Sequence, residues 1–409
     1  MNDDRRPAAR KPAHAVRRSR ATYVRRRLAV VIVAVLVVGV VAALARRDDG
    51  ASPQRVAQSS STVPTSAAAT ASPGEEPAAT STSTSGPPRP APPGTVTISA
   101  VGDTILGKGG SLPPNPATYL SAVSPALKDG AQIVFGNLEG TLSDVSGSKC
   151  AGSTSGNCFA FQVPPDYAQH LASAGFTVLN AANNHSHDFG QAGLDQTVKA
   201  VRGAGMAVTG LPGEVAVVDG GGIRVGFVGF APYRETPNML DLPAARDLIR
   251  SARGQADVVV VYMHAGAEGS DADHVTGKDE TYLGEARGNA QQFAHMAIDE
   301  GAALVLGSGP HVLRGAEFYK GHLIAYSLGN FAGYANFVTT GDRANSAILH
   351  VTLDGAGTYQ GGHVIPVALT SKNQPKPGGN AVATMAALSE ADFGPAAAMI
   401  ASDGTITPP

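Results

Sequence analysis

The sequence contains no tryptophan, only two cysteines and no internal repeat in its 409 residues. Two cysteines without a nearby pair of histidines do not make a typical structural zinc site. Outside the first 27 residues there is also no basic cluster: this leader holds ten lysines and arginines, whereas the remainder has 21 basic against 31 acidic residues. An acidic body does not suit a polyanion, so we expect no nucleic-acid partner.

Charge is absent from one long stretch, the 18 residues from Leu28 to Ala45, which are almost all apolar. This length is just enough to cross a bilayer as a helix. Because the more basic side of such a segment stays in the cytoplasm, residues 1–27 are predicted to be a cytoplasmic leader and the C-terminal body to lie outside the cell membrane. A cleaved signal peptide, with Ala43-Leu44-Ala45 as its cleavage site, is the alternative. The long leader and the long apolar run favour an uncleaved single-pass anchor.

Large apolar side chains are scarce in residues 46–94, where Ser, Thr, Pro and Ala predominate. Such a segment buries too little apolar surface to offset its ordering entropy, so it is predicted to be a disordered stalk between the membrane and a domain at 95–370. Residues 371–409 are rich in Gly, Ala and Pro and are expected to be peripheral or partly loose. In an exported domain, Cys150 and Cys158 are expected to form a disulfide that closes a polar surface loop.

The domain contains short, nearly continuous apolar runs, which are typical of strands buried on both faces. They lie at 95–103, 131–139, 176–185, 223–230, 256–264, 302–308, 322–330 and 346–353. Helical patterns lie between several of them, at 165–174, 193–205 and 280–300. Strands that alternate with helices predict an α/β fold. The runs from 322 onward have no helix between them, which favours antiparallel strands there.

Polar residues stand at or just after the ends of five of these runs. They are Asp103, Glu139, Asn184 with His185, His264 and His311. In an open α/β sheet, the carboxyl ends of the strands form the ligand-binding edge, so these side chains are expected to converge. Any one of them alone would be an ordinary turn residue or helix cap. The repetition of the pattern at five strand ends indicates a site.

The types of these side chains favour a metal site. Carboxylate, amide and imidazole ligands together suit Mn, Fe or Zn ions. A shared carboxylate can bridge two such cations about 3.5–4 Å apart, and the pair clamps a phosphate and lowers the pKa of a water molecule. A neighbouring histidine can protonate the leaving group. We therefore expect a two-metal, hydrolase-like site, with a single divalent ion as the alternative.

Five segments carry a family resemblance: AVGDTILG, FGNLEGTL, LNAANNHSHDFGQAGLDQT, YMHAGAE and GSGPHVLRGAEFYKGHLIAYSLGNF. The most specific parts are residues 182–185 with Asp188, and residues 327–331. From about residue 95 to 370, the chain resembles the bacterial capsule-synthesis CapA family, which is linked to poly-γ-glutamate capsule biosynthesis. That family is similar in fold to calcineurin-like metallophosphoesterases, so the resemblance implies an αββα sandwich.

The resemblance also implies a role for each matched residue. The metal ligands would be Asp103, Glu139 as a bridging carboxylate, Asn184, His264 and His311. His185 would be the general acid or a phosphate contact, Asp188 would orient His185, and Glu268 and Asn330 would support the ligands.

The chain departs from the family pattern at several positions next to these residues. Ser308 and Gly309 stand where the family commonly has a histidine before the Pro-His pair, Ile105 replaces a histidine that metallophosphoesterases usually carry, and Ala265 replaces an aromatic residue. One metal site is therefore short of ligands, which leaves open a single ion, two weakly bound ions or a loss of catalysis.

Two functions are consistent with this pattern. The first is a metal-dependent hydrolase that acts on a phosphoester or an envelope polymer. The second is a non-catalytic envelope component that binds or escorts an anionic polymer and works with membrane polymer-synthesis proteins. The acidic body opposes simple electrostatic capture of a polyanion, although a bound metal could bridge the two.

Overall fold

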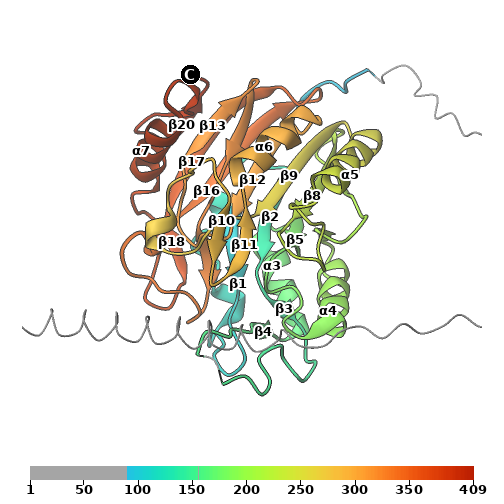
Figure 1. Cartoon of the computed structure of the whole chain (residues 1–409), viewed down its shortest axis with the longest axis vertical. Coiled ribbons are helices and arrows are strands. Elements are labelled where there is room, and N and C mark those ends of the chain that lie inside the picture. The colour runs from blue at the N-terminus through green and yellow to red at the C-terminus, as the bar shows by residue number, and fades with distance from the viewer. Residues whose placement is uncertain (1–89, 155) are drawn as a thin grey trace, which may run out of the picture. The chain divides into compact units, whose positions relative to one another are not determined.

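The computed structural model describes residues 90–154 and 156–409, which are coloured in Figure 1. The predicted leader (1–27), the predicted anchor (28–45) and nearly all of the predicted stalk (46–94) lie outside the described residues. In the part that is described, none of the helices combines the length and the apolar character needed to cross a bilayer.

Two large β-sheets form the centre of the domain. The first contains, in spatial order, β19 (Met399–Ile400), β20 (Thr405–Thr407), β17 (Tyr359–Leu369), β16 (Asn345–Asp354), β1 (Thr95–Ile105), β2 (Ile133–Leu138), β5 (Val178–Asn180) and β6 (Ala207–Thr209); β15 (Asn330–Gly333) pairs with β1, and β18 (Pro375–Pro377) pairs with β17. The second contains β13 (Ala316–Tyr319), β14 (His322–Ala325), β12 (Leu304–Ser308), β9 (Val258–His264), β8 (Arg224–Phe230) and β7 (Ala216–Asp219).

Two smaller pairs of strands complete the β structure. Antiparallel strands β10 (Glu280–Tyr282) and β11 (Glu285–Gly288) form a hairpin, and β3 (Thr141–Leu142) pairs with β4 (Gln162–Val163) in parallel. Short 3-10 turns lie at Pro116–Thr118, Pro165–Tyr167, Ser270–Ala272, Gly341–Ala344 and Gly394–Ala396.

The sheets pack face to face through apolar side chains of their inner faces. Phe135 of β2 stacks on Phe227 of β8 with ring centroids 5.6 Å apart, and it lies 5.3 Å from the ring of Tyr262 in β9. All three side chains are buried, and complete burial of a large apolar side chain stabilises a fold by about 1.5–3 kcal/mol. Burial in this inter-sheet core is one reason why the sequences of β2, β8 and β9 are nearly continuous apolar runs.

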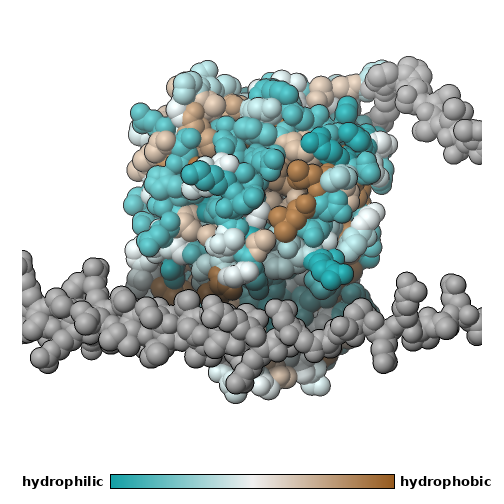
Figure 2. All heavy atoms as spheres, viewed as in Figure 1, coloured by the Kyte–Doolittle hydropathy of each residue, from teal (hydrophilic) through white to brown (hydrophobic). Residues whose placement is uncertain are grey.

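Helices cover the outer faces of both sheets. Helices α2 (Ser124–Lys128), α3 (Ala168–Ala174) and α4 (Gly190–Gly203) share a buried apolar cluster with the first sheet, and α5 (Leu242–Gln255) and α6 (Ala290–Asp299) share another with the second. The domain is therefore a mixed α/β sandwich with the layer order αββα, as predicted (Figure 1). On the face seen in Figure 2, hydrophilic residues predominate and apolar residues form only small patches.

The strands that matter for the site run parallel. In the first sheet β1, β2, β5 and β6 are parallel neighbours, and in the second sheet β8, β9, β12 and β14 are. Of the late runs, 346–353 forms β16, which pairs antiparallel with β1 and β17 as expected. Run 322–330 forms β14, which has one parallel and one antiparallel neighbour, and β15, which pairs in parallel with β1. The carboxyl ends of β1, β2, β5, β9 and β12 thus become available to a common site.

Two predicted helices correspond to the structure, and the third is partly wrong. Residues 165–174 form a 3-10 turn followed by α3, and 193–205 overlap α4. Of the predicted helix 280–300, only the second half is helical, as α6. Its first half forms the β10–β11 hairpin because Leu283 and Gly284 both have positive φ (49° and 85°), which makes a tight turn. The following Asn289 caps α6 by accepting a hydrogen bond from the Gln292 amide at 3.0 Å.

The C-terminal tail, expected to be peripheral or partly loose, is instead part of the fold. Helix α7 (Ala381–Phe393) contacts β13 of one sheet and β17 of the other, and its Ala381 and Met385 belong to the inter-sheet core. Strand β20 also extends the first sheet by pairing with β17. Alanine and methionine favour a helix even where the pattern is weakly amphipathic, which is why periodicity did not reveal α7.

The predicted strand 322–330 splits into two strands of different sheets. Residues 326–329 connect β14 in the second sheet to β15 in the first, and Gly329 turns with φ +64°. The carbonyl of Gly329 accepts a hydrogen bond from the Asp103 amide at 2.9 Å. A Cβ at Gly102 would lie 1.9 Å from that carbonyl oxygen, so only glycine permits this approach.

The Gly102 contact leads to a stability prediction. Gly102→Ala should lower the free energy of unfolding by about 1–3 kcal/mol or more, because the new methyl group must displace the backbone that orients Asp103. Gly109→Ala is a matched control because a Cβ there would meet no atom within 4 Å. Urea unfolding of both variants tests this, and equal stabilities would contradict it.

Candidate metal centre

Three buried side chains from three strand ends come together between the sheets. Asp103 lies near the end of β1, Glu139 directly follows β2 and His264 ends β9, and each is 0% exposed. Their potential ligand atoms all lie within 4.8 Å of one another. Nε2 of His264 is 3.8 Å from Oε1 of Glu139, and its Nδ1 is 4.0 Å from Oδ1 of Asp103. The expected convergence of these strand ends is thus observed.

His311, three residues beyond β12, joins the same cluster. Its Nδ1 lies 3.1 Å from Oδ2 of Asp103 and its Nε2 lies 3.6 Å from Oε1 of Glu139. The residue has φ +61°, a left-handed conformation that costs a non-glycine residue about 1–3 kcal/mol and is typical of functional sites. Asn330 holds His311 on two sides: its Oδ1 accepts from Nδ1 at 2.8 Å and its Nδ2 donates to the His311 carbonyl at 3.2 Å. Nε2 is therefore the ring nitrogen of His311 that Asn330 leaves free to bind a metal.

The cluster contains several buried polar atoms without a hydrogen-bond partner. They are Oδ2 of Asp103, both carboxylate oxygens of Glu139 and Nε2 of His264. Oδ2 of Asp103 has only the ion-pair contact to His311. Buried polar atoms are nearly always hydrogen-bonded, so a group of unpartnered polar atoms, most of them carboxylate oxygens, calls for another explanation. A cation would satisfy them, and carboxylate oxygens with an imidazole nitrogen suit a divalent metal.

The other oxygen of Asp103 is fully occupied. Oδ1 accepts hydrogen bonds from Nδ2 of Asn137 at 2.8 Å and from the hydroxyl of Ser308, which in turn contacts the Tyr262 hydroxyl. Ser308 stands where the family resemblance leads one to expect a histidine, and here it orients Asp103. Asn137 had not been singled out in the sequence; it also accepts hydrogen bonds from Asn180 (2.8 Å) and Asn183 (3.0 Å) and so ties the β2 and β5 ends together.

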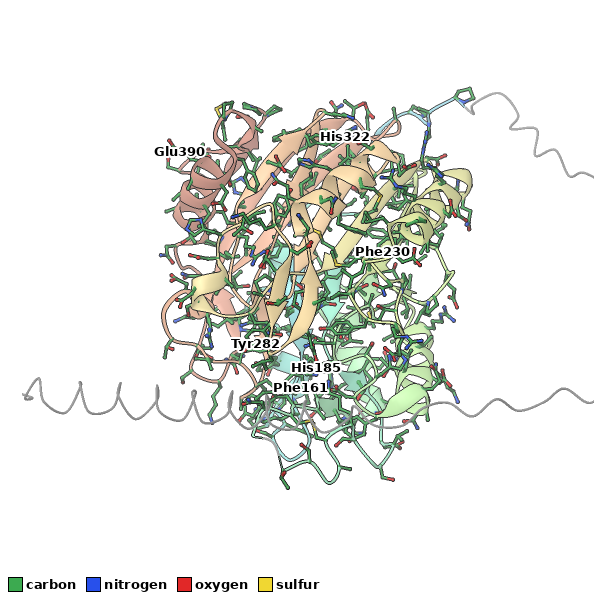
Figure 3. All side chains as sticks on the ribbon, viewed as in Figure 1. Phe161, His185, Phe230, Tyr282, His322 and Glu390 are labelled. Atoms are coloured by element: carbon green, nitrogen blue, oxygen red, sulfur yellow. A yellow bond between two sulfur atoms is a disulfide. The ribbon has the colours of Figure 1, made fainter. Side chains whose placement is uncertain are left out.

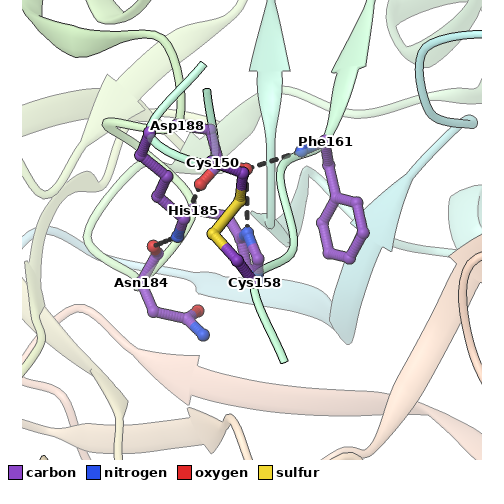
Figure 4. The surroundings of a disulfide bond; sticks show 7 residues. Cys150, Cys158, Phe161, Asn184, His185 and Asp188 are labelled. Atoms are coloured by element: carbon purple, nitrogen blue, oxygen red, sulfur yellow. Dashed lines mark hydrogen bonds and ion pairs between the residues drawn. A yellow bond between two sulfur atoms is a disulfide. The ribbon is translucent and has the colours of Figure 1, made fainter. Parts of the chain in front are cut away.

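His185 and Asp188 form a buried pair beside the cluster. A carboxylate only accepts, so the Nδ1–H of His185 donates to Oδ2 of Asp188 at 2.8 Å. The same oxygen accepts the Phe161 amide at 2.6 Å, and the Phe161 ring stacks on the imidazole with centroids 4.2 Å apart. Figure 4 draws these hydrogen bonds as dashed lines, and Figure 3 places His185 and Phe161 at the end of the sheets opposite His322.

Glu268 links the cluster to an arginine that sequence reasoning missed. Its Oε1 accepts from Nη2 of Arg287 at 2.7 Å, and its Oε2 lies 3.7 Å from Nε2 of His311. The Arg287 side chain is 4% exposed and lies over the rings of Tyr282 and Tyr233, at 5.4 and 5.9 Å. Arg287 was not predicted as a site residue, because residues 280–300 were expected to form one helix and a helix there would not bring Arg287 to a strand end.

The cluster has strongly shifted pKa values. Burial, with the charge of Asp103, raises the pKa of Glu139 well above its ordinary value. Burial opposes ionisation of Asp103, but His311, His264 and Ser308 outweigh it and lower the pKa of this carboxyl. Burial lowers the pKa of His264 to about 3, whereas Glu139 and Asp103 overcome burial and raise the pKa of His311 to about 10. His264 is therefore neutral at pH 7, which is the form that binds a metal.

Burial also lowers the pKa of His185, although Asp188 opposes this shift.

Asn184 is the predicted ligand with the weakest geometric link to the others. Its backbone carbonyl accepts from Lys149 at 2.9 Å, and its Oδ1 is buried without a hydrogen bond. The predicted disulfide between Cys150 and Cys158 is confirmed.

These observations define a class: an α/β sandwich with a buried carboxylate–histidine cluster where strand ends of two sheets meet. The chain belongs to the bacterial capsule synthesis protein PGA_cap family, whose sequence profile matches residues 97–335. This confirms the family predicted from the motifs.

Individual relatives agree with this assignment. The chain is 31% identical over 207 residues to the PGA biosynthesis protein CapA of Bacillus subtilis (strain 168), covering 46% of this chain and 51% of the relative. It is 29% identical over 292 residues to the capsule biosynthesis protein CapA of Bacillus anthracis, covering 64% and 65%. The chain thus spans about half to two thirds of the length of these curated relatives.

Among solved structures, a hypothetical protein from Thermus thermophilus is similar, with a TM-score of 0.43 and 15% identity over 66% of this chain and 98% of that one. This similarity is too distant to bear on function.

Proposed function

We propose that the domain is a metal-dependent hydrolase of the phosphoesterase type that acts in the biosynthesis of a capsule or envelope polymer of the poly-γ-glutamate kind. The observation that carries the proposal is the group of polar atoms without hydrogen-bond partners on Asp103, Glu139 and His264, all fully buried and close together. Buried carboxylates without partners destabilise a fold, and they are retained where a ligand compensates for them.

The polar atoms without hydrogen-bond partners identify the residues that would hold a cation. Asp103 would bind through Oδ2, His264 through Nε2 and Glu139 through either oxygen. His311 would bind through Nε2 and release the proton that its raised pKa leaves on the ring without metal. Because both Glu139 oxygens lack a hydrogen-bond partner, Glu139 could also serve a second ion, which Asn184 would help to hold. The donor set suits Mn, Fe or Zn. When bound, such a cation polarises a phosphoryl oxygen and makes a water molecule more acidic.

His185 is proposed to handle the proton of the leaving group. Because its Nδ1–H is held by Asp188, its Nε2 is the atom left to contact a phosphate or a leaving oxygen. Phe161 stacked on the ring restricts its rotation. The adjacent Asp188 thus orients the imidazole, as the resemblance implies.

The biological setting follows from the names of the relatives and from the predicted topology. Two relatives are named for PGA or capsule biosynthesis. The predicted single-pass anchor and stalk would place the domain on the outer side of the cell membrane, near an envelope polymer and membrane polymer-synthesis proteins. The confirmed disulfide supports an exported domain, because disulfides persist in oxidising compartments.

A second function is favoured by Ser308. Its hydroxyl occupies Oδ1 of Asp103, and no imidazole is available from that position for a second ion. A site with too few ligands for two ions suits a polymer-binding or assembly factor, in which one cation bridges the acidic domain and an anionic polymer.

Metal content and turnover separate these functions. The full-length chain, purified in detergent, is dialysed against Mn, Fe(II) or Zn and assayed with bis(4-nitrophenyl) phosphate. Bound metal with turnover supports the hydrolase, bound metal without turnover supports the binding factor, and absence of bound metal contradicts both.

A further inference from the structure

The loop closed by the disulfide lies directly against the His185–Asp188 pair. Cys150 and Cys158 are bonded to each other, and Figure 4 shows them beside Asp188, His185 and Phe161. Neither the family resemblance nor the proposed function gives this loop a part in the site. Both of its flanks, Lys149 on one side and Phe161 on the other, nevertheless contact Asp188.

Lys149 contacts Asp188 with both its backbone and its side chain. Its amide donates to the Asp188 carbonyl at 2.7 Å, and its Nζ lies 2.7 Å from Oδ1 of the Asp188 carboxylate. The ammonium also donates to the carbonyl of Asn184 at 2.9 Å. Lys149 therefore holds both ends of the segment 184–188, which carries His185 between them.

The two oxygens of Asp188 have separate partners. Oδ2 accepts from His185 and from the Phe161 amide, whereas Oδ1 has the Lys149 ammonium as its ion-pair partner. The carboxylate is 0% exposed and the lysine side chain is 38% exposed. Removing the counter-charge of a buried carboxylate strongly destabilises the arrangement around it, and here only the two contacts of Oδ2 would remain to hold Asp188.

The disulfide explains how an exposed lysine keeps a fixed position. Residues 146–161 form only turns and irregular backbone wherever they are described, so secondary structure does not anchor Lys149. The bond joins residues eight positions apart and restrains the loop next to both contacts with Asp188.

We propose that Lys149, restrained by the Cys150–Cys158 disulfide, is a positioning residue that fixes the Asp188 carboxylate and through it the imidazole of His185. Its effect on turnover rests on the proposed function. Its effect on the imidazole does not, because the contacts that carry it involve neither a metal nor a substrate.

The test compares Lys149→Met, Lys149→Arg and the double variant Cys150→Ser/Cys158→Ser in the full-length protein. The readout is the NMR signal of the His185 Nδ1 proton in protein with 15N-labelled histidine, assigned from its absence in His185→Gln. Lys149→Met and the double variant should broaden or lose this signal by faster exchange with water, and Lys149→Arg should retain it. Lys320→Met, which removes an exposed ion pair to Asp299 elsewhere, is the matched control and should leave the signal unchanged.

Kinetics with bis(4-nitrophenyl) phosphate provide the second readout. In Lys149→Met, kcat should fall by about tenfold to a hundredfold through misplacement of His185, while KM and metal content stay as in the wild type. A wild-type His185 signal and kcat in Lys149→Met would overturn the proposal, as would failure of Lys149→Arg to restore either. If the wild-type protein shows no turnover, the proposed function fails, but the NMR comparison still decides the role of Lys149.

Discussion

Glu139→Met should abolish metal binding and at the same time stabilise the metal-free protein. Changes in residues that merely support metal ligands already weaken metal affinity by about 10–100-fold, so loss of this ligand should exceed that. The free energy of unfolding without metal should rise by about 1–3 kcal/mol, because methionine removes two buried oxygens that have no partner and fills a similar volume. Calorimetric metal titration and urea unfolding measure the two effects.

Glu317→Met is the matched control. Glu317 is also buried, but its Oε1 accepts from the Tyr326 hydroxyl at 2.6 Å and contacts Nε2 of His295 at 2.7 Å. Its removal should destabilise the protein by about 1–3 kcal/mol and leave metal binding intact. If Glu139→Met lost stability as Glu317→Met does, Glu139 would be a structural residue rather than a metal ligand.

His185→Gln should separate chemistry from metal binding. A positioned general acid contributes about 10²–10⁴-fold to a rate, so turnover of bis(4-nitrophenyl) phosphate should fall by that factor while metal content stays unchanged. Steady-state kinetics with metal analysis of the same samples measure this. His350→Gln serves as the control, because His350 is partly buried and its Nε2 donates to the Ala126 carbonyl at 3.0 Å, in a different part of the first sheet. Unchanged turnover in His185→Gln would remove His185 from the mechanism.

The sequence predicted the buried parallel strands and the convergence of their carboxyl ends. It did not predict how the strands divide between two sheets. Apolar runs ending in Asp103, Glu139 and His264 identified parallel strands, and parallel strands place their carboxyl ends at one edge. Two sheets were not evident from these runs, because periodicity says which residues are buried but not against which partner. The split of 322–330 between sheets depends on Gly102 and Gly329, whose close approach is visible only in three dimensions.

The roles of Asn137, Ser308 and Arg287 in the site were not predicted, for one physical reason. Asn137 and Ser308 act on Asp103 through hydrogen bonds, and Arg287 acts through Glu268, so each supports a candidate ligand rather than offering one. Arg287 also lies in a hairpin whose sequence has helical character, and there tertiary packing overrides local propensity. Helix α5 was missed although Asp241, its N-cap, accepts a hydrogen bond from the Ala244 amide at 3.2 Å.

We expect strand ends of the two sheets to enclose a divalent cation. Anomalous diffraction from a crystal of the manganese-loaded protein would locate it. A peak is expected among Oδ2 of Asp103, a Glu139 oxygen and Nε2 of His264, with His311 beside it. A fully loaded crystal with no peak there, or with its peak elsewhere on the domain, would show that this cluster is not a metal centre.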